Sequence, residues 1–283
     1  MTINANDIIA FKALAARSPV SASEFAAFLE ATGIPLVGVT GRRHIVPEAR
    51  DAVESAASAT LPGLARGRTI CVATGLAIGA DQLAMESVLA AKEMGARIVA
   101  VALLPTSVAE YRRDFSTEPG TGRGTASELD DFDRYLALAD LIVEIEPTPE
   151  NVERKKRGEP IDRMAQYAAL GDFLVERSRL LWAFWSGDAS NVKRGGTADV
   201  VLRKSRRVPS GGAGAEAICC VATPEVLRFK NPDGTKTRVP EPIENAGKAA
   251  FWTTPSDAVP TFEAAEIAAA KAAKFWESTE RDR

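Results

Sequence analysis

The sequence contains one histidine, His44, and three cysteines among its 283 residues. A Ser-His-Asp or Cys-His mechanism would have to pass through His44, and we do not expect one. The odd number of cysteines and the lack of metal-ligand spacing argue against a disulfide framework and against a zinc site. Because Cys71, Cys219 and Cys220 lie in apolar, strand-like runs, we expect buried free thiols in a reducing cytoplasm, with no bound metal and no cofactor.

Long apolar runs and a large excess of charge are also missing. No apolar run approaches the ~20 residues that a membrane helix needs, and the N-terminal residues show no basic segment followed by the apolar core of a secretory signal. The net charge of -3 gives no general attraction to nucleic acid or to an anionic membrane. We therefore expect a cytoplasmic protein with no membrane partner, for which nucleic acid ranks low among the partners.

Between residues 35 and 224 the sequence alternates six short apolar runs with amphipathic segments. The runs that we predict to be strands are 35–41, 69–75, 96–105, 140–147, 180–187 and 216–224. The segments that we predict to be helices are 46–61, 80–95, 125–139, 160–179 and 195–208. Because most of the runs are continuously apolar, they indicate a mainly parallel sheet with helices on both faces. The predicted fold class is therefore α/β, Rossmann-like and doubly wound.

The two ends of the chain do not share this alternation, and we predict three regions. Residues 1–34 are a helical lead-in, in which Ser21 or Ser23 begins a helix that Gly33 ends. Residues 35–224 form the α/β domain. Residues 225–283 contain a hairpin that turns at Pro232-Asp233-Gly234, followed by a C-terminal helix packed on the same core.

Three of the predicted strands end in glycine-rich turns. These turns are Thr40-Gly41-Arg42-Arg43-His44, Gly75 to Asp81, and Ser186-Gly187 followed by Gly195-Gly196-Thr197-Ala198-Asp199. In a parallel α/β sheet, ligands bind beyond the carboxyl ends of the strands. Glycine lets the backbone turn sharply and leaves no Cβ in the way of a ligand, and a helix N-terminus offers N–H groups to an anion. The three turns together predict one phosphate-binding pocket.

The residues that we expect to bind the ligand lie in these turns and after the third strand. They are Thr40, Gly41, Arg42, Arg43, Gly75, Gly79, Ala80, Asp81, Tyr111, Asp114, Gly195, Gly196 and Thr197. The threonines would supply hydroxyl groups and the arginines would clamp phosphate. Asp81 either caps its helix or contacts a ribose hydroxyl or a base. Tyr111 either stacks on a base or anchors its loop with Phe115, and Asp114 would accept from a base or a ribose.

At these residues the sequence resembles the SLOG superfamily, which groups Smf/DprA-like DNA-processing proteins with LOG-type phosphoribohydrolases. The resemblance covers roughly residues 35–222. LVGVTGRRH is similar to the opening G-[IV]-[ST]-G-x-R motif, and the glycine-rich turn that ends in GAD at residues 79–81 is similar to the second motif. YRRDF at residues 111–115 resembles Tyr-x-x-Asp-Phe, and the WSG and GGT segments near residues 185–197 resemble the last motif.

The resemblance implies a Rossmann-like domain that binds nucleotides or nucleotide-derived ligands at those turns. Members of the superfamily are phosphoribohydrolases, single-stranded DNA binders or sensors of nucleotide signals. LOG enzymes carry PGGxGTxxE, whereas in this chain Thr197 directly follows Gly195-Gly196 without the further glycine of that motif, and Val200 stands where the glutamate is expected. This departure puts hydrolysis of an N-glycosidic bond in doubt.

We therefore expect, first, a module that binds a nucleotide-derived small molecule, acting as a sensor whose output passes through a homo-oligomer or a separate partner. The second hypothesis is a nucleoside 5′-monophosphate phosphoribohydrolase or another nucleotide N-glycosidase. Such an enzyme needs a carboxylate near the reacting sugar carbon, and the candidates are Asp81, Glu110, Asp114 and Asp199. Binding of single-stranded DNA ranks third, because the basic runs 154–157 and 203–207 have no aromatic residues between them.

Overall fold

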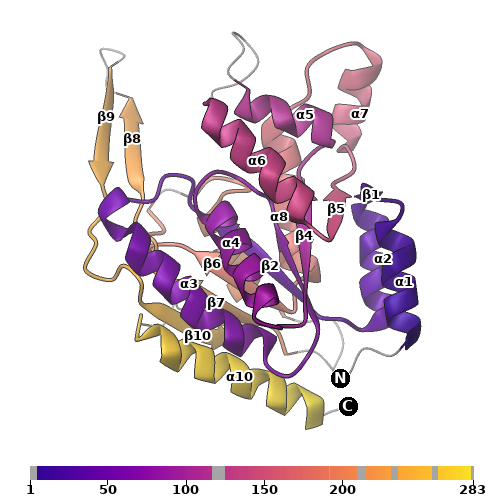
Figure 1. Ribbon diagram of the computed structural model, residues 1–283. Helices are drawn as coiled ribbons and strands as arrows, with labels where there is room; N and C mark the ends of the chain where they lie inside the picture. Colours follow the sequence, from indigo (N-terminus) through magenta and orange to yellow (C-terminus); the bar gives the residue numbers. More distant parts are fainter. Residues whose placement is uncertain are drawn as a thin grey trace.

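A computed structural model describes residues 5–116, 125–190, 192–208, 215–230, 235–256 and 261–281. Its centre is an eight-stranded sheet with the order β1-β5-β4-β3-β2-β6-β7-β10 (Figure 1). The strands, in that order, are Val20–Ser21, Leu141–Glu144, Ile98–Leu104, Ile70–Thr74, Leu36–Gly41, Leu180–Phe184, Ala217–Val221 and Ala249–Thr253. All neighbouring strands are parallel except β10, which pairs antiparallel with β7. The predicted α/β, mainly parallel, Rossmann-like fold is confirmed.

The helices cover both faces of this sheet. They are α1 Ala5–Ala15, α2 Ala22–Thr32, α3 Arg50–Ala65, α4 Ala80–Glu93, α5 Val108–Arg112, α6 Ala126–Leu138, α7 Pro149–Lys156, α8 Arg163–Arg177, α9 Thr197–Ser205 and α10 Ala265–Arg281, with short 3-10 turns at Pro47–Ala49 and Arg113–Phe115. One face packs against α3, α4, α6 and α10, and the other packs against α2, α8 and α9. Each predicted helix is present, with bounds that differ by a few residues.

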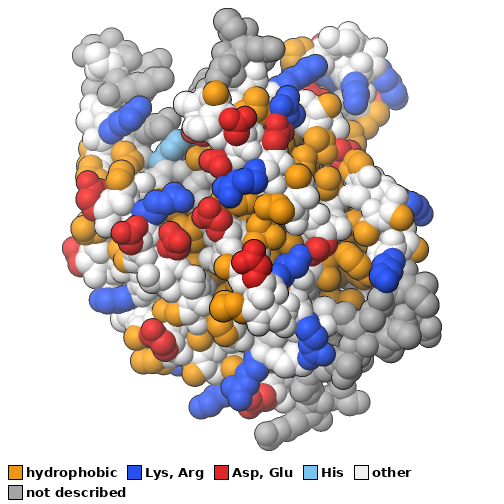
Figure 2. All heavy atoms as spheres, in the orientation of Figure 1, with side chains coloured by type: hydrophobic (Ala, Val, Ile, Leu, Met, Phe, Trp, Pro, Cys, Tyr) orange, Lys and Arg blue, Asp and Glu red, His pale blue; other side chains and the backbone are white. Residues whose placement is uncertain are grey.

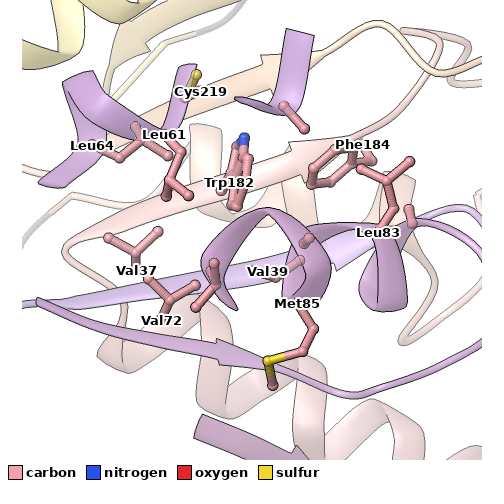
Figure 3. Close-up of a cluster of buried hydrophobic side chains, with 14 of the residues drawn as sticks. Val37, Val39, Leu61, Leu64, Val72, Leu83, Met85, Trp182, Phe184 and Cys219 are labelled. Carbon is pink, nitrogen blue, oxygen red and sulfur yellow. The ribbon is translucent and has the colours of Figure 1, made fainter. Parts of the chain in front are cut away.

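The continuously apolar strands are explained by the two covered faces. Consecutive strand residues point to opposite faces, so Trp182 and Phe184 pack with α3 and α4, whereas Leu181 and Ala183 belong to the opposite core. Figure 3 shows Trp182 among side chains of β2, β3, α3 and α4. The three cysteines are buried free thiols in the same strands, as expected.

The two edge strands of the sheet, β1 and β10, were not predicted from the sequence. The two residues of β1 pair with β5, so the N-terminal segment adds a strand to the sheet as well as its helices. Ser21 caps α2 through a reciprocal capping box with Glu24, and Gly33 ends it in a left-handed conformation. Ser23, the other predicted cap, instead donates through its backbone N–H to Glu146 at 2.9 Å.

The C-terminal region packs on the sheet and on α3 (Figure 1). The hairpin consists of β8, Val226–Lys230, and β9, Lys236–Pro240; its predicted turn, Pro232-Asp233-Gly234, lies outside the described residues. Helix α10 approaches α3 so closely that a Cβ on Gly63 would lie 2.2 Å from the carbonyl oxygen of Ala269. Among the described residues, no helix has the length and apolar character to cross a membrane.

Candidate functional site

Loops that follow parallel strands meet at the carboxyl edge of the sheet and enclose a cavity of about 460 Å³. The loops after β2, β3, β4 and β6 form its walls, and the start of the hairpin β8–β9 completes them. The predicted residues that line the cavity are Thr40, Gly41, Arg42, Arg43, Gly75, Asp81, Tyr111, Gly195, Gly196 and Thr197. His44 also lines it and is visible in pale blue in Figure 2, between the hairpin and the helices at the top of the view.

The first two turns are packed directly on each other. A Cβ on Gly41 would lie 2.3 Å from the Cβ of Ala80, and a Cβ on Gly79 would lie 2.3 Å from the carbonyl oxygen of Arg43. The N–H of Ala80 donates to the carbonyl of Arg42 at 3.0 Å. Gly79 also has a φ of 92°, which side chains rarely adopt. Gly41 and Gly79 therefore make room for the neighbouring turn, whereas the sequence had predicted room for a ligand, and Ala80 is buried in the contact.

Asp81 stabilises the loop that precedes its helix. Its Oδ2 atom accepts a hydrogen bond from the N–H of Ala77 at 3.4 Å, and the Thr74 hydroxyl donates to the Asp81 carbonyl at 3.0 Å. Within the same loop Leu76 is fully buried and has a φ of 55°, a strained conformation for a branched side chain. Asp81 is thus the second residue of α4 and not its N-cap. The N-cap position is occupied by Gly79, and the helix has no side-chain cap hydrogen bond.

Burial raises the pKa of the Asp81 carboxyl group to about 7, although the N–H of Ala77, the nearby Arg43 guanidinium and the N–H of Gly75 all act in the opposite direction. A carboxyl group with such a pKa exists in both protonation states near neutral pH. It can therefore accept a hydrogen bond from a ligand when ionised and donate one when protonated.

The third turn leads into α9. Gly195 has a φ of 74° and lies against the backbone of α8, where a Cβ would meet Ala168 at 2.8 Å. Asp199 accepts from the N–H of Gly195 at 2.9 Å and pairs with Arg203, so its carboxylate shapes the turn and does not line the cavity. Gly196 is the cap residue and offers no side chain. Thr197 and Ala198 begin α9 and line the cavity, which places the positive end of this helix against it.

The two arginines of the first turn differ in their partners. Arg42 forms an ion pair with Glu225 from the hairpin at 2.8 Å, so its charge is already balanced, contrary to the prediction of two phosphate clamps. The Arg43 guanidinium lies over the ring of Tyr167, 5.2 Å from its centroid. Arg43 and Lys193, which also lines the cavity, form no ion pair with the part of the chain that the structure describes.

Tyr111 and Asp114 support the cavity from behind. The Tyr111 ring is buried and packs edge-on against Phe115 and Phe132, at 5.2 and 5.6 Å between centroids. It therefore anchors its loop and does not lie open for stacking on a base. Asp114 accepts from the Tyr167 hydroxyl at 2.8 Å and pairs with Arg163. Of the four carboxylates considered for catalysis, Glu110 lines a separate cavity of about 330 Å³, and only Asp81 lines the main one.

Several residues of the wall were not predicted from the sequence. They are His44, Pro105, Tyr167, Leu170, Asp188, Ser190, Lys193, Glu225, Val226 and Leu227, together with Val39, Ala77 and Ala198. Tyr167 lies on α8, outside the predicted turns, and the hairpin residues lie more than 140 positions after the first two turns. The only available signal was proximity in sequence to a glycine turn, which holds for Lys193 and His44.

The comparisons with known proteins add little to what the structure shows. No protein-family model matches the chain, and no curated protein matches it. Among solved structures, the X-ray structure of DNA processing protein A (DprA) from Streptococcus pneumoniae matches 61% of this chain with 16% sequence identity and a TM-score of 0.35. The match covers 47% of that chain, so this protein spans about half of its length. Because this likeness is weak, the fold class rests on the sheet itself.

Proposed function

We propose that the cavity binds a phosphorylated, nucleotide-derived small molecule and that the protein is a sensor of that ligand. The observation that carries the proposal is a set of unused polar groups around one cavity. The hydroxyl groups of Thr40 and Thr197 line it, and neither forms a hydrogen bond within the described part of the chain. Thr40 is only 8% exposed as a residue, but its hydroxyl is not among the fully buried atoms without a partner, so it opens into the cavity, where a ligand can bond to it.

The phosphate is best accommodated at the start of α9. The N-terminus of that helix attracts an anion, and the Thr197 hydroxyl can donate to it. The Lys193 side chain, which forms no ion pair with the described residues, lines the same wall. Arg43 completes the set, because its guanidinium can form two parallel hydrogen bonds with a phosphate. In this proposal Arg42 holds the hairpin through Glu225 and makes no direct phosphate contact.

The sugar and base would extend from the phosphate toward Asp81 and Tyr167. The sheet order places the end of β6, which leads to α9, two strands from the end of β3, which leads to Asp81, a separation of about 10 Å at the usual strand spacing. This length and the cavity volume of about 460 Å³ are suited to a ligand of nucleotide size. Asp81, whose carboxyl group lies near the Arg43 guanidinium, would then pair with a hydroxyl or base group that adjoins the phosphate.

The proposal includes the assignment to the SLOG superfamily, a cytoplasmic location and a homo-oligomer or separate partner that receives the signal. Binding of single-stranded DNA remains the third candidate. The basic residues of both runs are largely paired within the chain, Lys156 with Glu153, Arg157 with Glu159, and Lys204 and Arg207 with Glu216. Basic and acidic side chains are also interspersed over the face seen in Figure 2, which does not favour a basic groove.

The test is isothermal calorimetry with inorganic sulfate, the four ribonucleoside 5′-monophosphates, ADP-ribose and a single-stranded oligonucleotide. We expect binding of at least one nucleotide, and Arg43→Ala should weaken it about tenfold to a hundredfold because a charged hydrogen bond is lost. Arg194→Ala is the matched control, since Arg194 precedes the third glycine turn but pairs with Asp172 and does not line the cavity. Failure of all these probes to bind would overturn the proposal, and binding of the oligonucleotide alone would favour the third candidate.

One observation favours the enzyme as a second candidate. Of the four carboxylates considered, only Asp81 reaches the cavity, and a group with a pKa of about 7 is suited to general acid–base catalysis. Incubation with AMP, NAD and ADP-ribose, followed by chromatography, would detect the free base. Release of base by the wild type but not by Asp81→Asn would establish hydrolysis and replace the sensor proposal.

A further inference from the structure

Tyr111 carries a hydroxyl group that has no hydrogen-bond partner within the described part of the chain. The sequence contains three tyrosines, and each is mainly or wholly buried against neighbouring side chains. The hydroxyl of Tyr135 donates to Glu86 at 2.6 Å and that of Tyr167 donates to Asp114 at 2.8 Å. Tyr111 is only 1% exposed as a residue, and its hydroxyl forms no hydrogen bond with any group in the described ranges.

The position of Tyr111 is firmly determined by its surroundings. The loop after β4 leads to Ser107, whose side chain caps α5 and whose carbonyl accepts from the Tyr111 N–H at 2.8 Å. The ring is held edge-on by Phe115, Phe132 and Tyr167, the last at 6.2 Å between centroids. These contacts hold the ring in one orientation, so the direction of its hydroxyl is fixed.

The hydroxyl faces the same cavity as Asp81 and Arg43, because Tyr111 is one of the residues that line it. Burial raises the pKa of the Tyr111 phenol well above its usual value, and the nearby Tyr167 acts in the same direction. The phenol is therefore protonated at physiological pH and is available as a hydrogen-bond donor.

We propose that the Tyr111 hydroxyl donates a hydrogen bond to the part of the ligand that lies beyond the phosphate, and so helps to select that part. The group recognised would be an oxygen or ring nitrogen of the sugar or base. This inference rests on the proposed function of the cavity. It differs from stacking, because the ring is enclosed by aromatic side chains and only the polar tip is left for recognition.

The test compares Tyr111→Phe with Tyr135→Phe, using inorganic sulfate and the tightest-binding member of the nucleotide panel as probes. Tyr111→Phe should weaken nucleotide binding about threefold to tenfold, the usual effect of one hydrogen bond, and should leave sulfate affinity and the melting temperature unchanged or slightly raise the latter. Tyr135→Phe should instead lower the melting temperature and leave nucleotide affinity unchanged, since it breaks an existing hydrogen bond to Glu86 that lies away from the cavity.

The outcomes separate the two proposals. If the wild type binds neither sulfate nor any nucleotide, the proposed function of the cavity fails. If the wild type binds a nucleotide and Tyr111→Phe binds it equally well, or if Tyr111→Phe lowers the melting temperature as much as Tyr135→Phe does, the inference about Tyr111 is overturned while the cavity remains a binding site. The inference about Tyr111 is also overturned, while the cavity remains a binding site, if the nucleotides bind no more tightly than sulfate.

Discussion

Asp81 connects the conformation of a loop with the charge inside the cavity. Its carboxylate is held by the loop at Gly75 and Ala77, and burial raises its pKa to about 7. In the unfolded chain an aspartate ionises near pH 4, so the native state binds more protons between about pH 4 and pH 7. The contribution of Asp81 to the free energy of unfolding therefore decreases as the pH rises through this window.

The same titration predicts a pH dependence of anion binding. As the pH rises from 6 to 8, ionisation of Asp81 places a negative charge beside the anion site, and we expect sulfate affinity to fall about threefold to tenfold. Sulfate is the suitable probe because its own charge does not change in this range. The measurement is calorimetric titration of the wild type and Asp81→Asn at several pH values.

The histidine of the cavity needs to be removed from this comparison. His44 lines the same space, and loss of a proton from a histidine would weaken anion binding in the same direction. The His44→Gln substitution is therefore introduced both into the protein that keeps Asp81 and into the Asp81→Asn variant. We expect sulfate affinity to fall with rising pH in the protein that keeps Asp81 and to stay constant in the Asp81→Asn variant. An equal fall in both proteins would show that Asp81 is not the cause.

At the scale of secondary-structure elements, the glycines of the first two turns set how closely the loops after β2 and β3 approach each other. We expect Gly79→Ala to lower the free energy of unfolding by at least about 2 kcal/mol more than Gly95→Ala. Both residues have nearly the same φ, 92° and 91°, but only at Gly79 would a Cβ meet backbone atoms, whereas nothing lies within 4 Å at Gly95.

The two variants are compared by urea unfolding, and sulfate binding is measured on each folded protein. Gly79→Ala should also weaken sulfate binding, since the backbone of Arg43 must move to admit the new methyl group. Equal destabilisation by the two substitutions would show that the positive φ alone matters and that the close contact between the turns contributes nothing.

The elements were predictable from the sequence because their signals are local. Continuous apolar runs such as Leu180–Phe184 identify strands buried on both faces, and glycine and polar caps identify helix ends. The strand β1 was missed because it has only two residues. The strand β10 was missed because it lies outside the alternation of strands and helices and pairs antiparallel with β7. The turns were predicted to meet because carboxyl ends of parallel strands share one edge, but the packing of Gly41 on Ala80 is visible only in three dimensions.

At the scale of the whole molecule, the C-terminal helix is part of the main core. Ala268, Ala272 and Phe275 are buried with residues of α3 and the sheet, and the Trp276 indole N–H donates to the carbonyl of Leu64 at 2.8 Å. The division into residues 1–34, 35–224 and 225–283 stays a prediction, and a test of whether these regions unfold together would decide it.

We expect Trp276→Ala to lower the free energy of unfolding by about 3 kcal/mol or more, because a large buried side chain leaves a cavity. Hydrogen exchange should show loss of protection in β2 and β6 together with α10 if the regions unfold as one unit. Ile267→Ala, on the partly exposed side of the same helix, is the control with little expected effect. Loss of protection confined to residues 261–283 would instead show an independently unfolding C-terminal region.

The cavity was less predictable than the sheet because its wall combines distant parts of the chain. Glu225 neutralises Arg42 across 183 positions, and Tyr167 reaches the cavity from a helix whose sequence indicates only packing. These contacts depend on how elements are placed after folding, so no local spacing indicates them. The residues of the glycine turns were found because they are adjacent to the strands that position them.

The contact between Gly41 and Ala80 constrains which substitutions this protein can accept in evolution. Each residue occupies the space that a larger side chain on the other would need, with only 2.3 Å between the two Cβ positions. A larger residue at one position is therefore compatible with the same turn only if the loops move apart and the cavity widens. We expect distant relatives to share small residues at both positions as a pair, so a search for them should weigh the two sites jointly.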